Sequence, residues 1–163
     1  SVSKKLSKGE IQRMSKKGEI TKLYFVDREN PATIAKKLNI SKSAVTQVLQ
    51  KDDRYKKEKE LTEYLVKGLE KIENVTTYLP LEDSHIGIVA FNIEGYKAED
   101  VGTILDQDYH IAVRTGYHCA PLIHKHLMDI EKGGVVRASV GRYTTRNDIE
   151  KLLEAVEELS EEM

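Results

Sequence analysis

The apolar positions of the chain change their spacing along its length. Between Ile20 and Leu49 they recur every three or four residues, which is typical of short amphipathic helices. Asn30-Pro31 and Ser41 precede two of these stretches, and such residues favour a helix start because their side chains accept hydrogen bonds from free backbone amides. We therefore expect helices over about 20–26, 31–38 and 41–50. Residues 6–18 hold two glycines and many lysines, which fits either an extra helix or a flexible basic arm.

The later part of the chain mixes helical and strand patterns. We expect a helix at 57–72, strands at 75–79 and 85–93, a helix at 98–105, strands at 111–114 and 135–139, and a closing helix at 147–159. Strands combined with two or three helices on one face imply an α+β sandwich. The predicted fold class is α+β, with an all-α domain over 1–57 and an α/β sandwich over 58–163.

Charge supports a division near residue 57. Residues 1–57 hold 15 Lys and Arg against 6 Asp and Glu, a net charge of +9, and the remaining residues hold 11 against 21, a net charge of −10. This asymmetry is expected when one end of a chain meets a polyanion. We find no apolar run of the ~20 residues needed to cross a bilayer and no secretory signal. A single cysteine without an export signal fits a reducing compartment, so we expect a cytoplasmic protein and no membrane partner.

The basic part resembles the helix-turn-helix of bacterial regulators. Residues 31–49 predict two short helices joined by a tight turn, and in such proteins the second helix enters the major groove of double-stranded DNA. Lys36 and Lys37 are expected to contact the phosphate backbone. The polar side of the second helix, expected to read base edges, carries Lys42, Ser43, Thr46, Gln47 and Gln50. The alternative is a three-helix bundle whose charged faces are only solvated, or one that binds another protein.

A second resemblance lies in the acidic part. Arg114-Thr-Gly-Tyr-His-Cys-Ala-Pro-Leu122 contains the only cysteine, and Gly134-Val-Val-Arg-Ala-Ser139 follows it before the closing helix. This order resembles the small C-terminal domain of the cysteine desulfurases, which are pyridoxal-phosphate enzymes of the class V aminotransferase group. The resemblance covers about 58–163. It implies that Cys119 matches the persulfide carrier and that Arg137 binds the carboxylate of an amino-acid substrate. Arg142-Tyr-Thr-Thr145 departs from the family, which usually has an asparagine before the threonine.

The resemblance also implies a cofactor that this sequence does not provide for. The family binds pyridoxal phosphate through a lysine in a Ser/Gly-x-His-Lys context of its large domain, and no stretch of this sequence matches that context. Desulfurization depends on the cofactor as electron sink. We therefore expect no bound pyridoxal phosphate and no independent desulfurase activity.

Three interpretations of Cys119 are open. Arg114 and His118 favour the thiolate electrostatically, which suits a sulfur-carrying or sensing thiol, and Arg114 could join Arg137 in binding a ligand. A lone buried cysteine can also be inert, as a small hydrophobe. The third interpretation is a metal site, for which the potential ligands are His118, Cys119, His124 and His126, although their spacing matches no ordinary zinc finger.

The function predicted from these patterns is a DNA-binding transcriptional regulator. It would bind as a homodimer, and its desulfurase-like domain would dimerise or sense a sulfur species, a small amino-acid effector or redox state. The alternative is a sulfur-transfer protein that receives persulfide on Cys119 from a sulfur donor. A third possibility is a fusion of two domains without a shared task.

Overall fold

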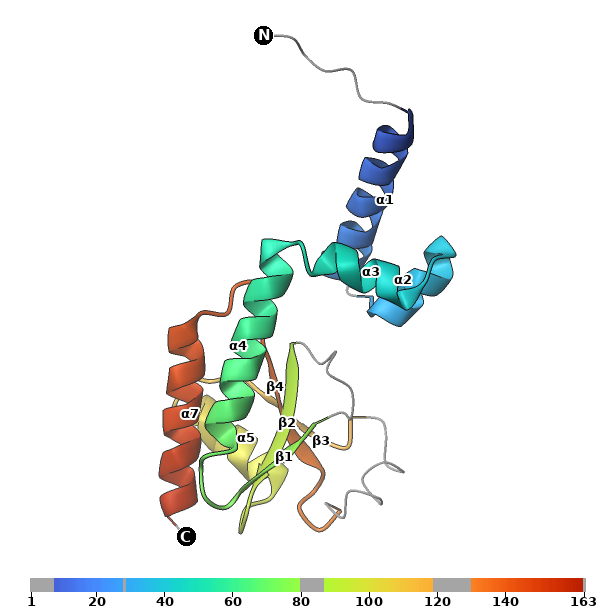
Figure 1. Cartoon of the computed structure of the whole chain (residues 1–163). Coiled ribbons are helices and arrows are strands. Elements are labelled where there is room, and N and C mark those ends of the chain that lie inside the picture. Colours follow the sequence, from blue (N-terminus) through green and yellow to red (C-terminus); the bar gives the residue numbers. More distant parts are fainter. Residues whose placement is uncertain (1–7, 28, 80–86, 119–129, 163) are drawn as a thin grey trace. The chain divides into compact units, whose positions relative to one another are not determined.

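The computed structural model describes residues 8–27, 29–79, 87–118 and 130–162, with side chains from residue 15 onward. The chain divides into two compact units, Ser1–Lys56 and Lys57–Met163. Figure 1 gives the element labels used below. Within the described ranges, no helix is both long and apolar enough to cross a membrane.

The first unit contains three helices, α1 (Lys8–Phe25), α2 (Pro31–Leu38) and α3 (Lys42–Leu49). The Asn30 side chain accepts from the Thr33 amide at 2.9 Å, and the Ser41 hydroxyl accepts from the Ala44 amide at 3.1 Å, so both expected caps are present. For residues 6–18, the sequence predicted either a helix or a flexible arm. The structure shows a helix from Lys8, because α1 continues through Gly18 without a break. Ile34, Val45 and Leu49 are fully buried and give this unit an apolar centre of its own.

The second unit is built on a four-stranded antiparallel sheet. Its strands are β1 (Val75–Tyr78), β2 (Ile88–Ile93), β3 (Arg114–Gly116) and β4 (Val135–Ser139), in the order β1-β2-β4-β3. Its helices are α4 (Asp53–Leu69), whose first residues lie in the first unit, α5 (Ala98–Gln107) and α7 (Arg146–Glu161). This arrangement confirms the predicted mixture of helices with a small sheet.

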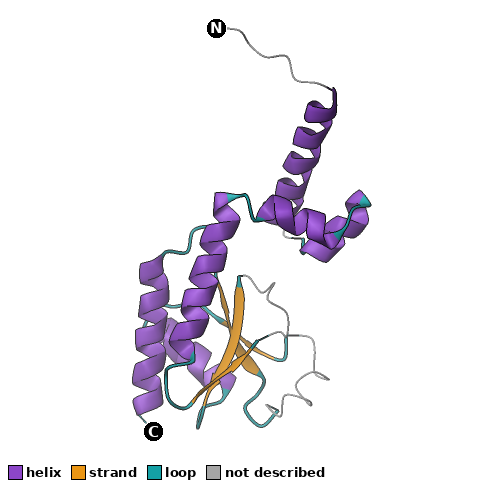
Figure 2. Ribbon diagram, in the orientation of Figure 1, coloured by secondary structure: helices purple, strands orange, loops and turns teal. Residues whose placement is uncertain are grey.

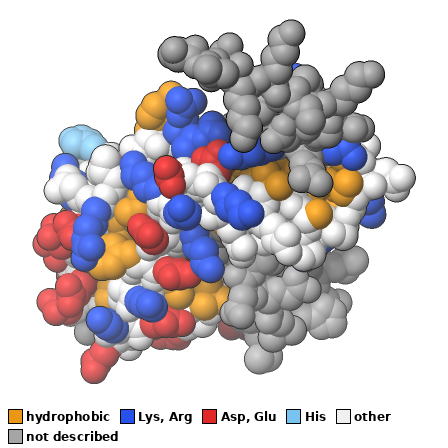
Figure 3. Space-filling model, turned by 45° about the horizontal axis from the view of Figure 1, so that its top comes forward, with side chains coloured by type: hydrophobic (Ala, Val, Ile, Leu, Met, Phe, Trp, Pro, Cys, Tyr) orange, Lys and Arg blue, Asp and Glu red, His pale blue; other side chains and the backbone are white. Residues whose placement is uncertain are grey.

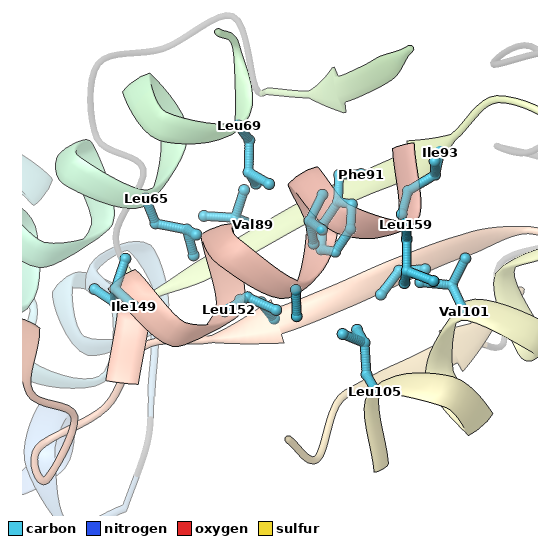
Figure 4. Packing of buried hydrophobic residues seen from close by; sticks show 14 of the residues in the cluster. Leu65, Leu69, Val89, Phe91, Ile93, Val101, Leu105, Ile149, Leu152 and Leu159 are labelled. Carbon is cyan, nitrogen blue, oxygen red and sulfur yellow. The ribbon is translucent and has the colours of Figure 1, made fainter. Parts of the chain in front are cut away.

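The three helices α4, α5 and α7 lie on one side of the sheet (Figures 1 and 2). Alternate residues of the strands point to that side, so Val89 and Phe91 of β2 and Val136 of β4 are fully buried against the helices. Figure 4 shows Val89 and Phe91 of β2 among the leucines of the helices, including Leu65, Leu152 and Leu105. No described helix covers the opposite face of the sheet.

The edge strand begins later than its sequence suggests. A strand is predicted at 111–114, but β3 starts at Arg114, where it first pairs with Arg137 of β4. Ile111 instead donates its amide to the Leu105 carbonyl at 2.8 Å, closing the turn that follows α5. Local β-propensity was therefore overridden by the end of the neighbouring helix.

A tyrosine–carboxylate contact gives this unit a pH signature. The Tyr109 hydroxyl donates to Glu158 Oε2 at 2.6 Å, and this hydrogen bond, followed by desolvation and nearby carboxylates, raises the pKa of Tyr109 to about 12. Because the folded-state pKa lies above that of the unfolded chain, the contribution to stability is complete below about pH 10 and is lost as pH rises from there toward 12. We expect Tyr109→Phe to lose less stability over this range than the unsubstituted protein. Urea denaturation at several alkaline pH values measures the difference, and parallel losses in both proteins would contradict it.

Candidate functional site

The face of the sheet opposite the helices carries a row of residues across all four strands. Tyr78 pairs with Ala90, Ala90 with Arg137, and Arg137 with Arg114. Residues directly opposite each other in antiparallel strands point to the same face. Since their neighbours Val136 and Ala138 face the helices, the two arginines point to the other side. The sheet thus places two guanidinium groups side by side.

Among the residues that the structure describes, no acidic side chain compensates the two arginines. Arg114 is exposed and Arg137 is half-buried, and Nε of Arg137 is buried without a hydrogen-bond partner. Within the described ranges, no ion pair involves either side chain. Like charges directly opposite each other destabilise a strand pair, and a buried donor without a partner costs about 1–3 kcal/mol. The arrangement is suited to an anion that bonds to both groups, and a carboxylate matches the planar guanidinium.

Side-chain contacts join the end of β3 to the start of β4. Residues 116–118 and 130–135, which make these contacts, are called the stem below. His118, which has a φ of 48°, places Nε2 3.3 Å from the Val135 carbonyl oxygen. The Tyr117 hydroxyl donates to the Ile130 carbonyl at 3.2 Å. Cys119 is the next residue after His118 and, with His124 and His126, lies outside the described residues. The thiol and metal interpretations therefore stay predictions, and no group of three or more His, Cys, Asp or Glu gathers in the rest of the structure that is described.

One residue next to this site was not predicted from the sequence. Asn92, on β2, is 1% exposed, and its Nδ2 donates to the Gly134 carbonyl at 2.9 Å and to the Tyr78 hydroxyl at 3.2 Å. The available signal was a polar amide inside a strand of otherwise apolar residues, because a buried polar group normally has a structural or functional partner.

The departure at Arg142-Tyr-Thr-Thr145 is accommodated locally. Thr144 Oγ1 accepts from the Gly141 amide at 2.9 Å and closes the turn. Thr145 caps α7, and its backbone and hydroxyl both donate to Asp148, which lowers the pKa of that carboxyl group. Tyr143 is 82% exposed. The threonine that replaces the expected asparagine therefore serves the turn itself.

A cavity of about 160 Å³ lies where the pairing of β3 and β4 ends, lined mainly by apolar side chains of Leu65, Ile111, Val113 and Leu152. Its charged lining residue, Asp148, is engaged in the helix cap. The arginine row is the better candidate for binding a charged ligand.

The residues predicted to contact DNA lie in the first unit. Lys36 and Lys37 lie in the last turn of α2, and Lys37 forms an ion pair with Glu29. Thr46 donates its hydroxyl to the Lys42 carbonyl within α3. Ser43, Gln47 and Gln50 are exposed.

Comparison with known proteins identifies what the chain resembles. The family model described as aminotransferase class-V matches residues 39–152. A probable cysteine desulfurase of Halalkalibacterium halodurans is 39% identical over 110 residues, which are 68% of this chain and 26% of that protein. The apo cysteine desulfurase structure from Thermococcus onnurineus NA1 has a TM-score of 0.61 at 33% identity and covers 75% of this chain. The cysteine desulfurase CsdA from Escherichia coli has a TM-score of 0.54 at 27% identity, also over 75%.

The chain spans about a quarter of the length of the curated relatives it matches, and 30% of each of these two solved chains. The resemblance to cysteine desulfurases is thereby confirmed. The family match also begins at residue 39, inside the segment predicted to be a helix-turn-helix.

The prediction of a DNA-binding transcriptional regulator is wrong, as is that of double-stranded DNA as the partner. The relatives are named cysteine desulfurases, and no comparison supports a helix-turn-helix DNA-binding domain. The prediction combined a pattern of two short capped helices with a positive net charge, and both features also occur in a small helical bundle whose charged faces are only solvated. Lys37, Arg54 and Lys56 of the first unit are engaged in ion pairs with Glu29, Asp52 and Asp53. Figure 3 shows Lys and Arg side chains lying among Asp and Glu side chains on the face it draws.

Proposed function

Because this chain belongs to the aminotransferase class-V family, we propose that it takes part in sulfur transfer, with Cys119 carrying sulfur from a cysteine-derived donor. The observation that carries the proposal is the pairing of Arg114 with Arg137 on the face of the sheet opposite the helices. The same strands lead into the stem from which Cys119 follows. An anion site and a thiol are therefore close in the chain.

Arg137 is proposed to bind the carboxylate of the sulfur donor. Its guanidinium can donate two parallel hydrogen bonds to a carboxylate, and its buried Nε has no other partner among the described residues. Arg114 adds a second positive charge from the neighbouring strand. A donor that carries both a carboxylate and a protonated persulfide group, such as cysteine persulfide, offers its carboxylate to this pair and its terminal sulfur to a thiolate.

The proposed step moves one sulfur atom without net oxidation. The Cys119 thiolate attacks the terminal sulfur of the donor persulfide, a new S–S bond forms on Cys119, and the old S–S bond breaks. Its electron pair leaves with the donor as a thiolate, so the reaction is a thiol–persulfide exchange in which charge and sulfur balance. Arg114 and His118 favour the thiolate form that attacks.

Pyridoxal phosphate, which desulfurization of cysteine itself requires, does not fit the described site. Such enzymes hold the cofactor as a Schiff base on a lysine. None of the four strands contains a lysine, so the sheet that carries the arginine row offers no amine at this face. The proposed step begins from sulfur that is already a persulfide.

We expect cysteine persulfide to add one sulfur atom to each reduced chain, and Cys119→Ser to abolish the addition because it removes the only thiol. Intact-mass and peptide mass spectrometry measure the loading and its position. Absence of sulfur on Cys119 would overturn the proposal.

The role of Arg137 is tested by changing the donor. Arg137→Lys should slow loading from cysteine persulfide by roughly tenfold or more, since hydrogen bonds to charged groups contribute about 1.5–3 kcal/mol. It should leave loading from inorganic polysulfide, which has no carboxylate, nearly unchanged. Arg142→Lys, which alters an exposed arginine beside Tyr143, is the matched control. Equal slowing with both donors would remove carboxylate recognition from the proposal.

A further inference from the structure

Asn92 links the sheet to the stem before Cys119. Its Nδ2 bonds to the Gly134 carbonyl and the Tyr78 hydroxyl, and both contacts lie at the end of the sheet where the stem begins. The Gly134 carbonyl can only accept, so the NH₂ of the amide must face it and Oδ1 must point elsewhere. The orientation of this buried side chain is therefore fixed by its partners.

Gly134 transmits this contact to the neighbouring strand. It directly precedes β4, and its α-carbon lies so close to Gly116 at the end of β3 that an added Cβ would be 2.4 Å from the Gly116 carbonyl carbon. The hydrogen bond from Asn92 to Gly134 therefore restrains both segments of the stem, the one that ends β3 and the one that begins β4. His118 and Tyr117 add two further contacts across the same stem.

We infer that Asn92 is a positioning residue for the proposed sulfur transfer: through Gly134 it fixes the stem between β3 and β4, and with it Arg137 and His118, the residue that precedes Cys119 in the sequence. The inference rests on the proposed function. Oδ1 of Asn92 is buried without a hydrogen-bond partner, which is unfavourable for a polar atom. An amide whose oxygen has no partner contributes less to stability than a fully bonded side chain. Its NH₂ group, in contrast, makes both hydrogen bonds, one of them to the stem.

The discriminating variant is Asn92→Asp. Its carboxyl group can donate to the Gly134 carbonyl only when protonated, and when ionised it repels that oxygen. We expect loading from cysteine persulfide to be roughly tenfold slower than in the unsubstituted protein near pH 8, since a misplacement of about 1 Å can cost about 100-fold in rate. The ratio of the two rates should approach one as pH falls through the pKa of the introduced carboxyl group, which burial raises.

Two further variants serve as controls for this result. Asn92→Leu, which cannot donate at any pH, should be slow throughout. Thr76→Val, which changes the exposed cross-strand partner of Asn92 on β1, should load like the unsubstituted protein. Rates are compared at a temperature where circular dichroism shows all variants folded. Should Asn92→Asp not fold, Asn92→Ser, whose hydroxyl is one bond shorter than the amide, is expected to load slowly in its place.

Failure of the inference differs from failure of the proposed function. If the unsubstituted protein takes up sulfur and folded Asn92 variants load equally fast at every pH, Asn92 has no positioning role. If the unsubstituted protein takes up no sulfur, the proposed function fails. The stem is then tested by the rate of Cys119 alkylation with iodoacetamide against pH, which needs no donor. A profile unchanged in Asn92→Leu would again overturn the inference.

Discussion

Gly134→Ala is expected to destabilise the second unit by roughly 3 kcal/mol or more. Gly134 has a φ of 95°, a conformation that costs a side-chain-bearing residue about 1–2 kcal/mol. The new methyl group would also lie 2.4 Å from backbone carbon and oxygen atoms of Gly116, which cannot move aside as a flexible side chain could. Overpacking of this kind adds about 1–3 kcal/mol. Urea denaturation followed by circular dichroism measures the change.

Gly133→Ala provides the matched control for this prediction. Gly133 also has a positive φ, 72°, but a Cβ there would meet no atom within 4 Å. It should therefore cost only the conformational part, about 1–2 kcal/mol. Equal losses in the two variants would show that the close approach of Gly134 to Gly116 does not limit stability.

Regular elements were predictable from the sequence because their signals are local. The helix at 31–38 and the strand at 135–139 have the predicted bounds, and the closing helix extends the predicted 147–159 by only a few residues to Arg146–Glu161. Caps and apolar periods depend on residues a few positions apart, so a single sequence contains them. The start of β3 was missed because it depends on pairing with β4, about twenty positions away.

The site was only partly predictable for the same reason. Cys119, Arg114 and Arg137 were singled out through a family resemblance, and their roles stay predictions. The register that sets Arg114 opposite Arg137 is a property of the folded sheet. The bond from Asn92 to Gly134 joins residues 42 positions apart, and no local pattern indicates it. The DNA-binding prediction failed because two short capped helices with a positive net charge also occur in helical bundles that do not bind DNA.

The arginine row predicts an unusual relation between stability and function. Arg137→Met removes a buried Nε without a partner and one of two like charges on adjacent strands, while an unbranched side chain of similar reach fills the space. Replacing a poorly compensated buried charge by an apolar group is often stabilising by about 1–4 kcal/mol. We therefore expect Arg137→Met to be more stable than the unsubstituted protein but slow to load sulfur from cysteine persulfide.

Urea denaturation at low and high salt tests this expectation. The stability advantage of Arg137→Met should shrink at high salt, because ions screen the repulsion that Arg114 exerts on Arg137. An amino acid such as alanine should stabilise the unsubstituted protein by binding its folded state, and should have little effect on Arg137→Met. Arg142→Met, at an exposed arginine of the same unit, controls for the loss of one charge. If Arg137→Met is less stable than the unsubstituted protein at low salt without ligand, the guanidinium is compensated within the fold, and the anion site loses its physical basis.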